Sequence, residues 1–357
     1  MRIAFDVSPL SHPATGVGNY IRGSLAGLLD AVAGTDEVVA FAPTGLRGPA
    51  RIRDALAGLD VELRTWPVPF SHAVRTAWSI AARPAAERLL GPFDVLHFTD
   101  WMYPPQQRGV RATMIHDLVP VRFPAWTTER TRAMHGRKYE NAARTCDVIF
   151  VNSAYTGGDV TELLHVPPER IRVAPPGVKE VFAPNGGAAD LGAPYIITVA
   201  TLEPRKNLEA LAEAHRMLAG DTLLAVVGGA GWGEQPLLDD PRVRRLGYVS
   251  DAELAALYRG ATVAAYPSRF EGFGMPIVEA MACGTPVVVS SHPSMDEASG
   301  EAAVRADPDD PEAIARALEQ AMVARDRLIA PGLAHASRFT WAATGRAMLD
   351  GYLAAPR

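Results

Sequence analysis

Two glutamates that flank a glycine-rich turn offer the most specific chemistry in the sequence. Glu271 opens the run Glu-Gly-Phe-Gly-Met-Pro, and Glu279 follows it inside a segment of helical character. Pro276 suits the first position of a helix, because the amide proton it lacks is not needed there. Amides of that first turn, near 275–278, could receive phosphate oxygens. Glu279, predicted in the same turn, could accept hydrogen bonds from a ribose diol, and Glu271 from a sugar hydroxyl. A pair of acids that only complements the helix dipole is the alternative.

Adjacent cations follow a predicted strand at 195–199. Arg205 and Lys206 stand in the run Thr-Leu-Glu-Pro-Arg-Lys-Asn. A guanidinium can bind a diphosphate with two hydrogen bonds, and an ammonium adds a point charge, so this turn could hold a nucleotide diphosphate. A solvated turn would explain the same residues. Asn207 is predicted to cap the helix that follows.

The N-terminal half carries two further candidates after strands. Gly16 and Gly18 stand in Thr-Gly-Val-Gly-Asn-Tyr, where glycines would let amides at a helix start approach a phosphate. The third glycine of a dinucleotide fingerprint is missing, so a plain tight turn is an equal alternative. His116 and Asp117 follow a strand at 112–115 and could face a cleft; a turn capped by Asp117 is the alternative. Trp101, after another strand, is more typical of packing than of sugar stacking.

Short apolar runs alternate with helical segments along the whole chain, which predicts parallel sheets covered by helices. Strands are expected near 3–7, 38–41, 95–98, 112–115 and 148–152, and again near 195–199, 223–227, 245–248, 261–266 and 286–290. Ligands of such sheets bind beyond the carboxyl ends of the strands, where the candidates above lie. The glycine-rich loop 228–233 also lies there, although a plain connector fits it equally well.

Length and a Pro/Gly-rich stretch predict two domains. A chain of 357 residues exceeds the roughly 250–300 residues that one core usually supports. We expect one doubly wound Rossmann-like domain over 1–178, a linker at about 174–190 and a second such domain over 186–338. An apolar-periodic helix at about 340–357 could pack back on the first domain, a point that periodicity alone does not decide.

Composition narrows the class of protein. Apolar residues make up 48% and charged residues 21%, and the formal net charge is −5, which gives no support to a nucleic-acid partner. The two cysteines fit a reducing cytoplasm and neither a disulfide framework nor a zinc site. The N-terminus enters a strand pattern directly, and no apolar run reaches the ~20 residues of a membrane span. The expected location is therefore the cytoplasm.

One basic and aromatic segment, 70–90, could contact an acceptor or an anionic membrane surface, although most segments of this kind are ordinary surface helices. It carries Trp78 and Ile80 among Arg75, Arg83 and Arg88. An ordinary surface helix is the alternative.

The glutamate motif resembles that of the retaining glycosyltransferases of family 4. Glu271 and Glu279 are separated by seven residues, and the run Glu-Ala-Met-Ala-Cys-Gly-Thr-Pro-Val follows. The resemblance extends over most of the chain: Gly16-x-Gly18-Asn-Tyr, Ile-His116-Asp117, Glu-Pro-Arg205-Lys206-Asn, and Leu-Gly-Tyr-Val-Ser-Asp251. It implies the GT-B fold, two facing Rossmann-like domains with the acceptor side in the first and the donor in the second.

That resemblance also implies roles for individual residues. Arg205 and Lys206 would bind the donor diphosphate, with Gly16 and Gly18 against it from the first domain, and Glu279 would bind the ribose. Glu271 and His116 would contact the transferred sugar. The backbone at the helix start would lie beside that sugar: Phe273, Gly274, Met275 and Pro276. No metal or other cofactor is expected. Many relatives have an acidic residue where this chain has Lys179, which leaves the hinge contacts in doubt.

The expected reaction is transfer of a hexose from a nucleotide-sugar to a glycan, glycolipid or small-molecule acceptor. The run Ile-His-Asp-Leu-Val-Pro-Val-Arg-Phe-Pro resembles bacterial mannosyl- and hexosyltransferases and favours GDP-mannose. UDP-glucose and UDP-N-acetylglucosamine stay open as donors. A non-catalytic nucleotide-sugar-binding protein would keep the same pocket. An NAD-dependent oxidoreductase would need the three-glycine fingerprint that the sequence lacks.

Overall fold

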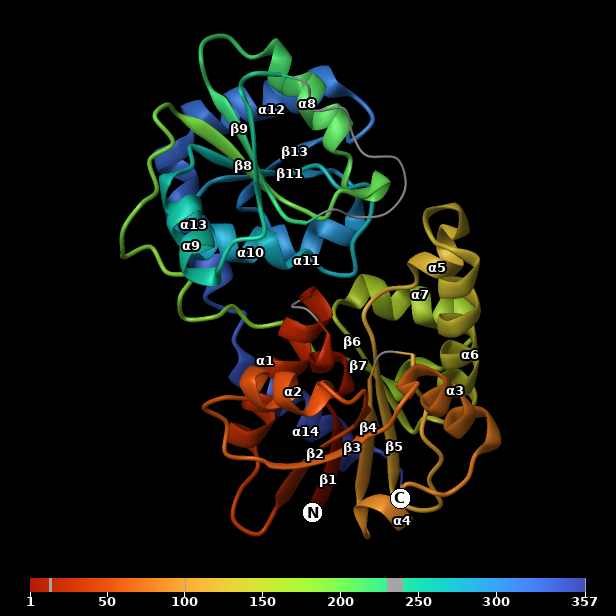
Figure 1. Ribbon diagram of the computed structural model, residues 1–357. Coiled ribbons are helices and arrows are strands. Elements are labelled where there is room, and N and C mark those ends of the chain that lie inside the picture. The colour runs from red at the N-terminus through yellow and green to blue at the C-terminus, as the bar shows by residue number, and fades with distance from the viewer. Residues whose placement is uncertain (13–14, 100, 230–239, 357) are drawn as a thin grey trace. The chain divides into compact units, whose positions relative to one another are not determined.

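The computed structural model describes residues 1–12, 15–99, 101–229 and 240–356 and divides the chain into two compact units (Figure 1). The N-terminal unit comprises Met1–Gly177 and Thr340–Arg357; the C-terminal unit comprises Val178–Phe339. Much of the stretch predicted as a linker belongs to the C-terminal unit. Phe182 is buried in that unit's core, and Arg259 donates hydrogen bonds to the carbonyl oxygens of Ala183 and Gly187.

The N-terminal unit is built on a parallel sheet in the order β3-β2-β1-β4-β5-β6-β7. Its strands are β1 (Arg2–Asp6), β2 (Glu37–Thr44), β3 (Glu62–Pro67), β4 (Val95–Phe98), β5 (Val110–Ile115), β6 (Val148–Val151) and β7 (Ile171–Val173). The sheet is covered by helices α1 (Gly16–Ala31), α2 (Gly48–Ala55), α3 (Ser71–Ala81), α4 (Glu87–Leu90), α5 (Val119–Arg122), α6 (Glu129–Thr145), α7 (Ala154–Leu164) and α14 (Trp341–Ala354), with short 3-10 turns η1 (Ser8–Ser11), η2 (Pro124–Trp126) and η3 (Pro168–Arg170).

The C-terminal unit is also built on a parallel sheet, with its strands in the order β10-β9-β8-β11-β12-β13. Its strands are β8 (Tyr195–Val199), β9 (Leu223–Val227), β10 (Val243–Gly247), β11 (Val263–Tyr266), β12 (Val287–Ser290) and β13 (Ala303–Ala306). The helices are α8 (Leu208–Met217), α9 (Asp251–Gly260), α10 (Met275–Ala282), α11 (Asp296–Ser299), α12 (Pro311–Val323) and α13 (Arg325–Ala336), with turns η4 (Pro204–Lys206) and η5 (Pro293–Met295). Two Rossmann-like α/β domains are thereby confirmed.

Three strands were not predicted, and each is short or polar. Strand β3 lies at the edge of its sheet and is only half-buried, so its sequence, ELRTWP, shows no apolar run. Strand β7 has three residues, and β13 carries the exposed Arg305. The strands at the centre of each sheet, by contrast, are almost continuously buried and apolar, as parallel strands covered on both faces are.

Each sheet has one place where the chain reverses the direction in which strands are added. In the N-terminal unit it lies between β1 and β4, and in the C-terminal unit between β8 and β11. The connections that follow such a pair of strands diverge to opposite faces of the sheet and leave a crevice at the carboxyl ends. The loops after β8 and β11 contain Arg205, Lys206 and Glu271.

The last helix returns to the N-terminal unit and packs on α1 (Figure 1). Glycines make the close approach of the two helices possible. A Cβ on Gly27 would lie 1.8 Å from the carbonyl oxygen of Trp341, and one on Gly345 would lie 2.0 Å from the backbone of Gly27. The approach is therefore set by backbone contacts that leave no space for a methyl group.

We expect Gly27→Ala to lower the free energy of unfolding by about 3 kcal/mol, because the two backbones must move apart and the packing of α14 is lost. Gly136→Ala is the matched control: it lies inside α6, where a Cβ would meet nothing within 4 Å. That change should stabilise the chain by about 0.5–1 kcal/mol through helix propensity. Urea unfolding of both variants measures the difference, and equal stabilities would contradict the α1–α14 contact.

The segment at 70–90 is not an ordinary surface helix, the alternative that its sequence left open. Arg75 and Trp78 are buried in the N-terminal unit and are closed to a membrane surface. The Arg75 guanidinium lies 4.4 Å from the ring centroid of Trp101, and the Trp78 indole donates a hydrogen bond to the carbonyl oxygen of Pro84. Ile80 is exposed. Among the described residues we find no helix that is both long and apolar enough to span a bilayer.

Candidate functional site

The two cations predicted to bind a diphosphate converge on one glutamate in the C-terminal unit. Arg205 Nη1 lies 2.8 Å from one carboxylate oxygen of Glu271, and Lys206 Nζ lies 2.6 Å from the other. All three side chains are at most 18% exposed. Separate loops supply them, since Arg205 and Lys206 lie on η4 after β8 and Glu271 follows β11. The sheet order, with β8 beside β11, brings these loops together.

Backbone and side-chain hydrogen bonds hold the two loops in register. The amide of Arg269 donates to the carbonyl oxygen of Arg205 at 2.9 Å. The amide of Glu271 donates to Ser294 Oγ at 3.1 Å. The prediction that the Asn207 side chain caps α8 is wrong. Its Nδ2 donates instead to the carbonyl oxygens of Pro267 and Pro308, and its backbone is left-handed with φ 57°. The cations are therefore placed by a preformed framework.

Electrostatics keep this cluster ionised. Burial by itself raises the pKa of Glu271, but attraction to Arg205 and Lys206, together with hydrogen bonds from both, outweighs burial and lowers the pKa to about 2. Burial lowers the pKa of the Lys206 ammonium, and Glu271 opposes that shift. Arg205 pairs with a second carboxylate, that of Glu203, at 2.9 Å, so two cations and two carboxylates meet in this cluster.

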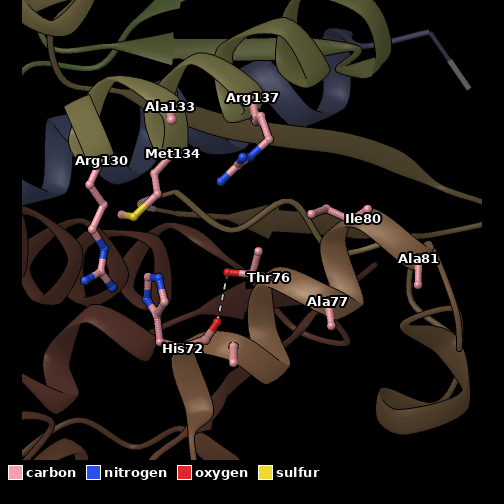
Figure 2. Close-up of a pocket in the computed structure, with 10 residues that line it drawn as sticks. His72, Thr76, Ala77, Ile80, Ala81, Arg130, Ala133, Met134 and Arg137 are labelled. Atoms are coloured by element: carbon pink, nitrogen blue, oxygen red, sulfur yellow. Dashed lines mark hydrogen bonds between the residues drawn. The ribbon is translucent and has the colours of Figure 1, made fainter.

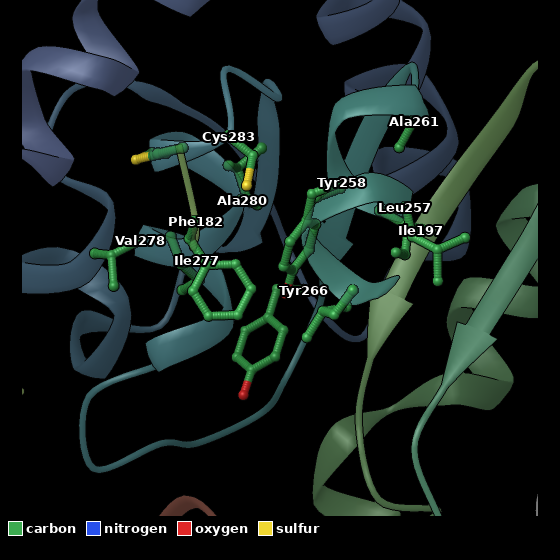
Figure 3. Packing of buried hydrophobic residues seen from close by; sticks show 14 of the residues in the cluster. Phe182, Ile197, Leu257, Tyr258, Ala261, Tyr266, Ile277, Val278, Ala280 and Cys283 are labelled. Atoms are coloured by element: carbon green, nitrogen blue, oxygen red, sulfur yellow. The ribbon is translucent and has the colours of Figure 1, made fainter. Parts of the chain in front are cut away.

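Two residues of this cluster were not identified from the sequence. Tyr266 ends β11, and its hydroxyl oxygen accepts a hydrogen bond from Lys206 Nζ at 2.8 Å. Figure 3 shows its ring among the apolar core residues, with the hydroxyl directed away from them. Glu203 accepts a 2.9 Å hydrogen bond from Arg205 Nε. Only the placement of Glu203 two residues before Arg205 could have indicated its role; nothing in the sequence distinguished Tyr266 from core aromatics.

The glycine loop ends in a strained turn at the start of α10. Gly274 has φ 101°, and a Cβ there would lie 2.8 Å from Ile277 Cδ1, so only glycine fits. Met275 is the first helical residue, and Pro276 is the second, one position later than predicted. The first amides of a helix have no partner inside it, and such amides suit an anion. The amide of Ile277 already donates to the carbonyl oxygen of Gly274 at 3.0 Å. Phe273 is buried, with its ring 5.2 Å from that of Phe339.

Glu279 lies in the second turn of α10, not in the first as predicted, so it does not complement the helix dipole. Its side chain is buried, and it forms no hydrogen bond with a described residue. Burial raises its pKa to about 7, against the opposing attraction of Lys179; Asp251 adds to the rise. Lys179 itself forms a 2.7 Å ion pair with Asp251. Both carboxylate oxygens of Glu279 are therefore available to a ligand.

In the N-terminal unit the paired glycines begin a helix. Gly16 and Gly18 belong to the first turn of α1, with Thr15 as the cap: its Oγ1 accepts the amide of Gly18 at 3.1 Å. A Cβ on Gly16 would meet nothing within 4 Å, so protein packing does not require glycine there. The space in front of Gly16 is open to a ligand that needs close approach to the helix amides.

His116 lies at the carboxyl end of β5 as a neutral imidazole. Burial and the nearby Lys138 lower the pKa of His116 to about 3. Its Nδ1 lies 3.3 Å from the amide oxygen of Asn152, which can only accept, so the proton resides on Nδ1. Nε2 is buried with no hydrogen-bond partner among the described residues and can accept a hydroxyl proton. Asp117 caps its turn by accepting the amide of Val119 at 3.0 Å.

The remaining predictions concern metal ligands, Trp101, the glycine-rich loop and the cysteines. No group of three or more potential metal ligands occurs in the part of the chain that the structure describes. Trp101 is buried, in keeping with a packing role. Residues 230–233 of the predicted glycine-rich loop at 228–233 lie outside the described residues. Both cysteines are buried and free.

Family models match both halves of the chain. The model described as "Glycosyltransferase Family 4" matches residues 15–181, and "Glycosyl transferases group 1" matches residues 193–323. The chain is 28% identical to the O-antigen chain mannosyltransferase B of Escherichia coli over 96% of both proteins. It is 30% identical to a D-inositol 3-phosphate glycosyltransferase of Acidothermus cellulolyticus, over 84% of this chain and 75% of that one.

Solved structures agree on the fold. Sucrose-phosphate synthase from Thermosynechococcus elongatus superposes with a TM-score of 0.75 at 20% identity, over 99% of this chain and 98% of that one. HepE from Anabaena, solved with UDP-glucose, gives a TM-score of 0.68 at 16% identity over 98% of both chains. The predicted fold and family are thus confirmed: this chain is a glycosyltransferase of family 4 with the GT-B fold.

Proposed function

We propose that the enzyme transfers a hexose from a nucleotide-sugar with retention of anomeric configuration and without a metal ion. The observation that carries this proposal is the convergence of Arg205 and Lys206 on Glu271 at the reversal point between β8 and β11. Two cations held there suit a diphosphate, and the hydrogen bond between their turn and the loop of Glu271 makes them preorganised.

Each part of the donor has a partner in this proposal. Arg205 and Lys206 bind the diphosphate, helped by the backbone amides of Phe273, Gly274 and Met275, with Pro276 beside them, and Glu279 accepts both ribose hydroxyls. Glu271 contacts the transferred sugar. In this proposal the N-terminal unit contributes the backbone at Gly16 and Gly18, where the Gly18 amide is held by Thr15, and the Nε2 lone pair of His116. A non-catalytic binding protein would use the same cations to hold the diphosphate, so a measurement of turnover distinguishes the two functions.

Charge development explains why the cations favour reaction over binding. The bond between the anomeric carbon and the diphosphate oxygen breaks through an oxocarbenium-like state, and negative charge grows on the departing diphosphate. Arg205 and Lys206 stabilise that charge most when the bond is nearly broken, so they lower the barrier. The acceptor hydroxyl attacks the same face of the sugar, and the leaving phosphate takes its proton.

GDP-mannose is the proposed donor, and UDP-glucose or UDP-N-acetylglucosamine is the alternative. The O-antigen mannosyltransferase of Escherichia coli, similar over almost the whole chain, supports mannose, whereas the UDP-glucose complex of HepE supports a UDP-sugar. The proposed acceptor is a glycan, glycolipid or small molecule. The proposed location is the cytoplasm, with peripheral contact at the inner membrane face.

A donor panel tests the proposal directly. The protein is incubated with GDP-mannose, UDP-glucose and UDP-N-acetylglucosamine, and the release of nucleoside diphosphate is measured with and without EDTA. We expect release from one donor, GDP-mannose first, with no loss in EDTA. NMR of the product should show the anomeric configuration of the donor. Inversion would refute the mechanism, and no release from any donor, with or without candidate acceptors, would favour the binding protein.

Glu279 should make donor affinity depend on pH. Its pKa of about 7 means that the uncharged carboxyl, a poorer acceptor for a ribose diol, predominates below neutrality. Donor affinity should therefore rise between about pH 6 and pH 8 as the carboxylate forms. Because this folded-state pKa lies above the usual 4.5, the same group makes the ligand-free protein less stable as pH rises from about 4.5 to about 7.

Titration of nucleoside diphosphate into wild type and Glu279→Gln across this range checks the dependence. The variant cannot ionise, so its affinity should be low and flat with pH, and its melting temperature should fall less between pH 5 and pH 7. Parallel pH profiles for the two proteins would show that another group is responsible.

A further inference from the structure

A groove of about 620 Å³ lies between α3 and α6 of the N-terminal unit. Figure 2 shows Arg130, Met134 and Arg137 projecting from α6 toward α3. Their spacing of four and three residues puts them on one face of α6. Thr76 and Ile80 line the opposite wall with the same periodicity. The groove is therefore made by two regular helix faces.

Positive charge is concentrated in this groove. Arg130 and Arg137 are exposed, and neither forms an ion pair or a hydrogen bond with a described residue. No acidic side chain belongs to the described residues that line the groove. The surrounding sequence, 70–145, contains eleven basic and six acidic residues, although the whole chain has a net charge of −5. The groove thus attracts an anion on a protein that as a whole repels one.

The space between the two arginines is apolar. Seven residues separate Arg130 from Arg137, about 10 Å along the helix axis. Met134 lies between them, and Ala77 and Ile80 face them from α3. Ile80 is 61% exposed, so its apolar surface remains accessible to a ligand. An inorganic anion would leave this apolar wall in water, whereas an anion with an attached hydrocarbon chain would cover both kinds of surface.

The α3 wall is anchored to the centre of the sheet. The ring of His72 lies 4.5 Å from that of Trp101, and the Arg75 guanidinium also lies on Trp101. Arg75 donates to Ser8 Oγ, which in turn donates to the buried carboxylate of Asp6 at 2.6 Å. Asp6 ends β1, at the reversal point of the N-terminal sheet. Hydrogen bonds and ring contacts therefore connect the groove to the carboxyl ends of the strands in its own unit.

We propose that this groove, the α3–α6 groove, binds the acceptor substrate and that the acceptor is a lipid-linked phosphate. Its phosphate contacts Arg130 and Arg137, and the hydrocarbon next to the phosphate lies on Met134, Ala77 and Ile80. Naming this ligand as the acceptor rests on the proposed function. The binding of such an amphiphile rests on the groove alone and is tested alone.

The test uses farnesyl phosphate below its micelle concentration, with farnesol and inorganic phosphate as partial ligands, by titration calorimetry. Farnesyl phosphate should bind the wild type at least about tenfold more tightly than either partial ligand. The double variant R130Q/R137Q should lose about tenfold or more in affinity for farnesyl phosphate, because two charge-assisted hydrogen bonds are removed. The control R53Q/R144Q removes the same charge from two exposed arginines outside the groove and should bind within about twofold of wild type.

Two further variants test whether the apolar wall of the groove contributes to binding. Ile80→Asn should weaken farnesyl phosphate severalfold and leave inorganic phosphate unchanged. Val323→Asn, at a residue that is 90% exposed in the C-terminal unit, should change neither.

Several outcomes overturn the proposal. These are no binding of farnesyl phosphate to the wild type, equal binding by R130Q/R137Q, or inorganic phosphate bound as tightly as the amphiphile. Binding only to vesicles with 30% phosphatidylglycerol, and not to monomeric farnesyl phosphate, would identify a membrane surface instead. Nucleoside diphosphate release by the wild type from the donor panel is measured separately and tests the proposed function alone. Wild type that binds farnesyl phosphate but no nucleotide-sugar would refute only the proposed function.

Discussion

Lys206→Ala is expected to reduce kcat about 10²- to 10³-fold and leave the fold intact. The ammonium is one of two cations that meet the charge developing on the leaving diphosphate, and preorganised groups of this kind contribute effects of that size. Its ion pair with Glu271 is lost, but Arg205 still pairs with that carboxylate at 2.8 Å. The loss should appear mainly in kcat, because the interaction strengthens as the bond breaks.

The matched control for this variant is Arg269→Ala, which removes a cation from the same pair of loops. Arg269 pairs with Asp309, whose side chain is 72% exposed. Surface pairs contribute little, so turnover should stay within about twofold of wild type. Steady-state kinetics with circular dichroism and thermal melts measure both variants. A folded Lys206→Ala enzyme with kcat near the wild-type value would remove Lys206 from the donor site.

Glu271→Gln should have two opposite effects, on activity and on nucleotide binding. Transfer should fall by about 10²-fold or more, because the carboxylate contact to the transferred sugar is lost. The ligand-free protein should also be destabilised by about 3 kcal/mol, since two buried cations lose their shared counter-charge. A nucleoside diphosphate supplies negative charge to those same cations. Its stabilising effect, measured as a shift in Tm, should therefore be larger in the variant than in wild type.

Asp309→Asn is the control, because it neutralises an exposed acid that pairs with a cation of the same loop. Its transfer rate and its Tm shift with GDP or UDP should match those of the wild type. Differential scanning fluorimetry with and without each nucleotide gives both stabilities. If Glu271→Gln shows the same nucleotide shift as wild type, Glu271 does not compensate the cations that bind the diphosphate.

The sequence by itself determined the fold class and the identity of the central residues. Buried parallel strands are apolar runs, such as 195–199 and 223–227, and can be read directly because both faces are covered by helices. Glycines and prolines around Glu271 marked the turn before α10 because few residues tolerate its backbone, as the φ of Gly274 shows. Local chemistry was enough at these positions.

Only the tertiary structure decided which of these residues act together. The contact of Arg205 and Lys206 with Glu271 joins positions 65 and 66 residues apart and exists because β8 pairs with β11, a pairing that periodicity does not specify. The same holds for Arg75 and Trp78, which look like a basic surface in the sequence but are buried because Trp101 and Pro84 lie against them. The α3–α6 groove likewise depends on two helices brought together by the fold. Sequence patterns record how each residue meets its immediate neighbours, whereas a site is made by strand order and long-range packing.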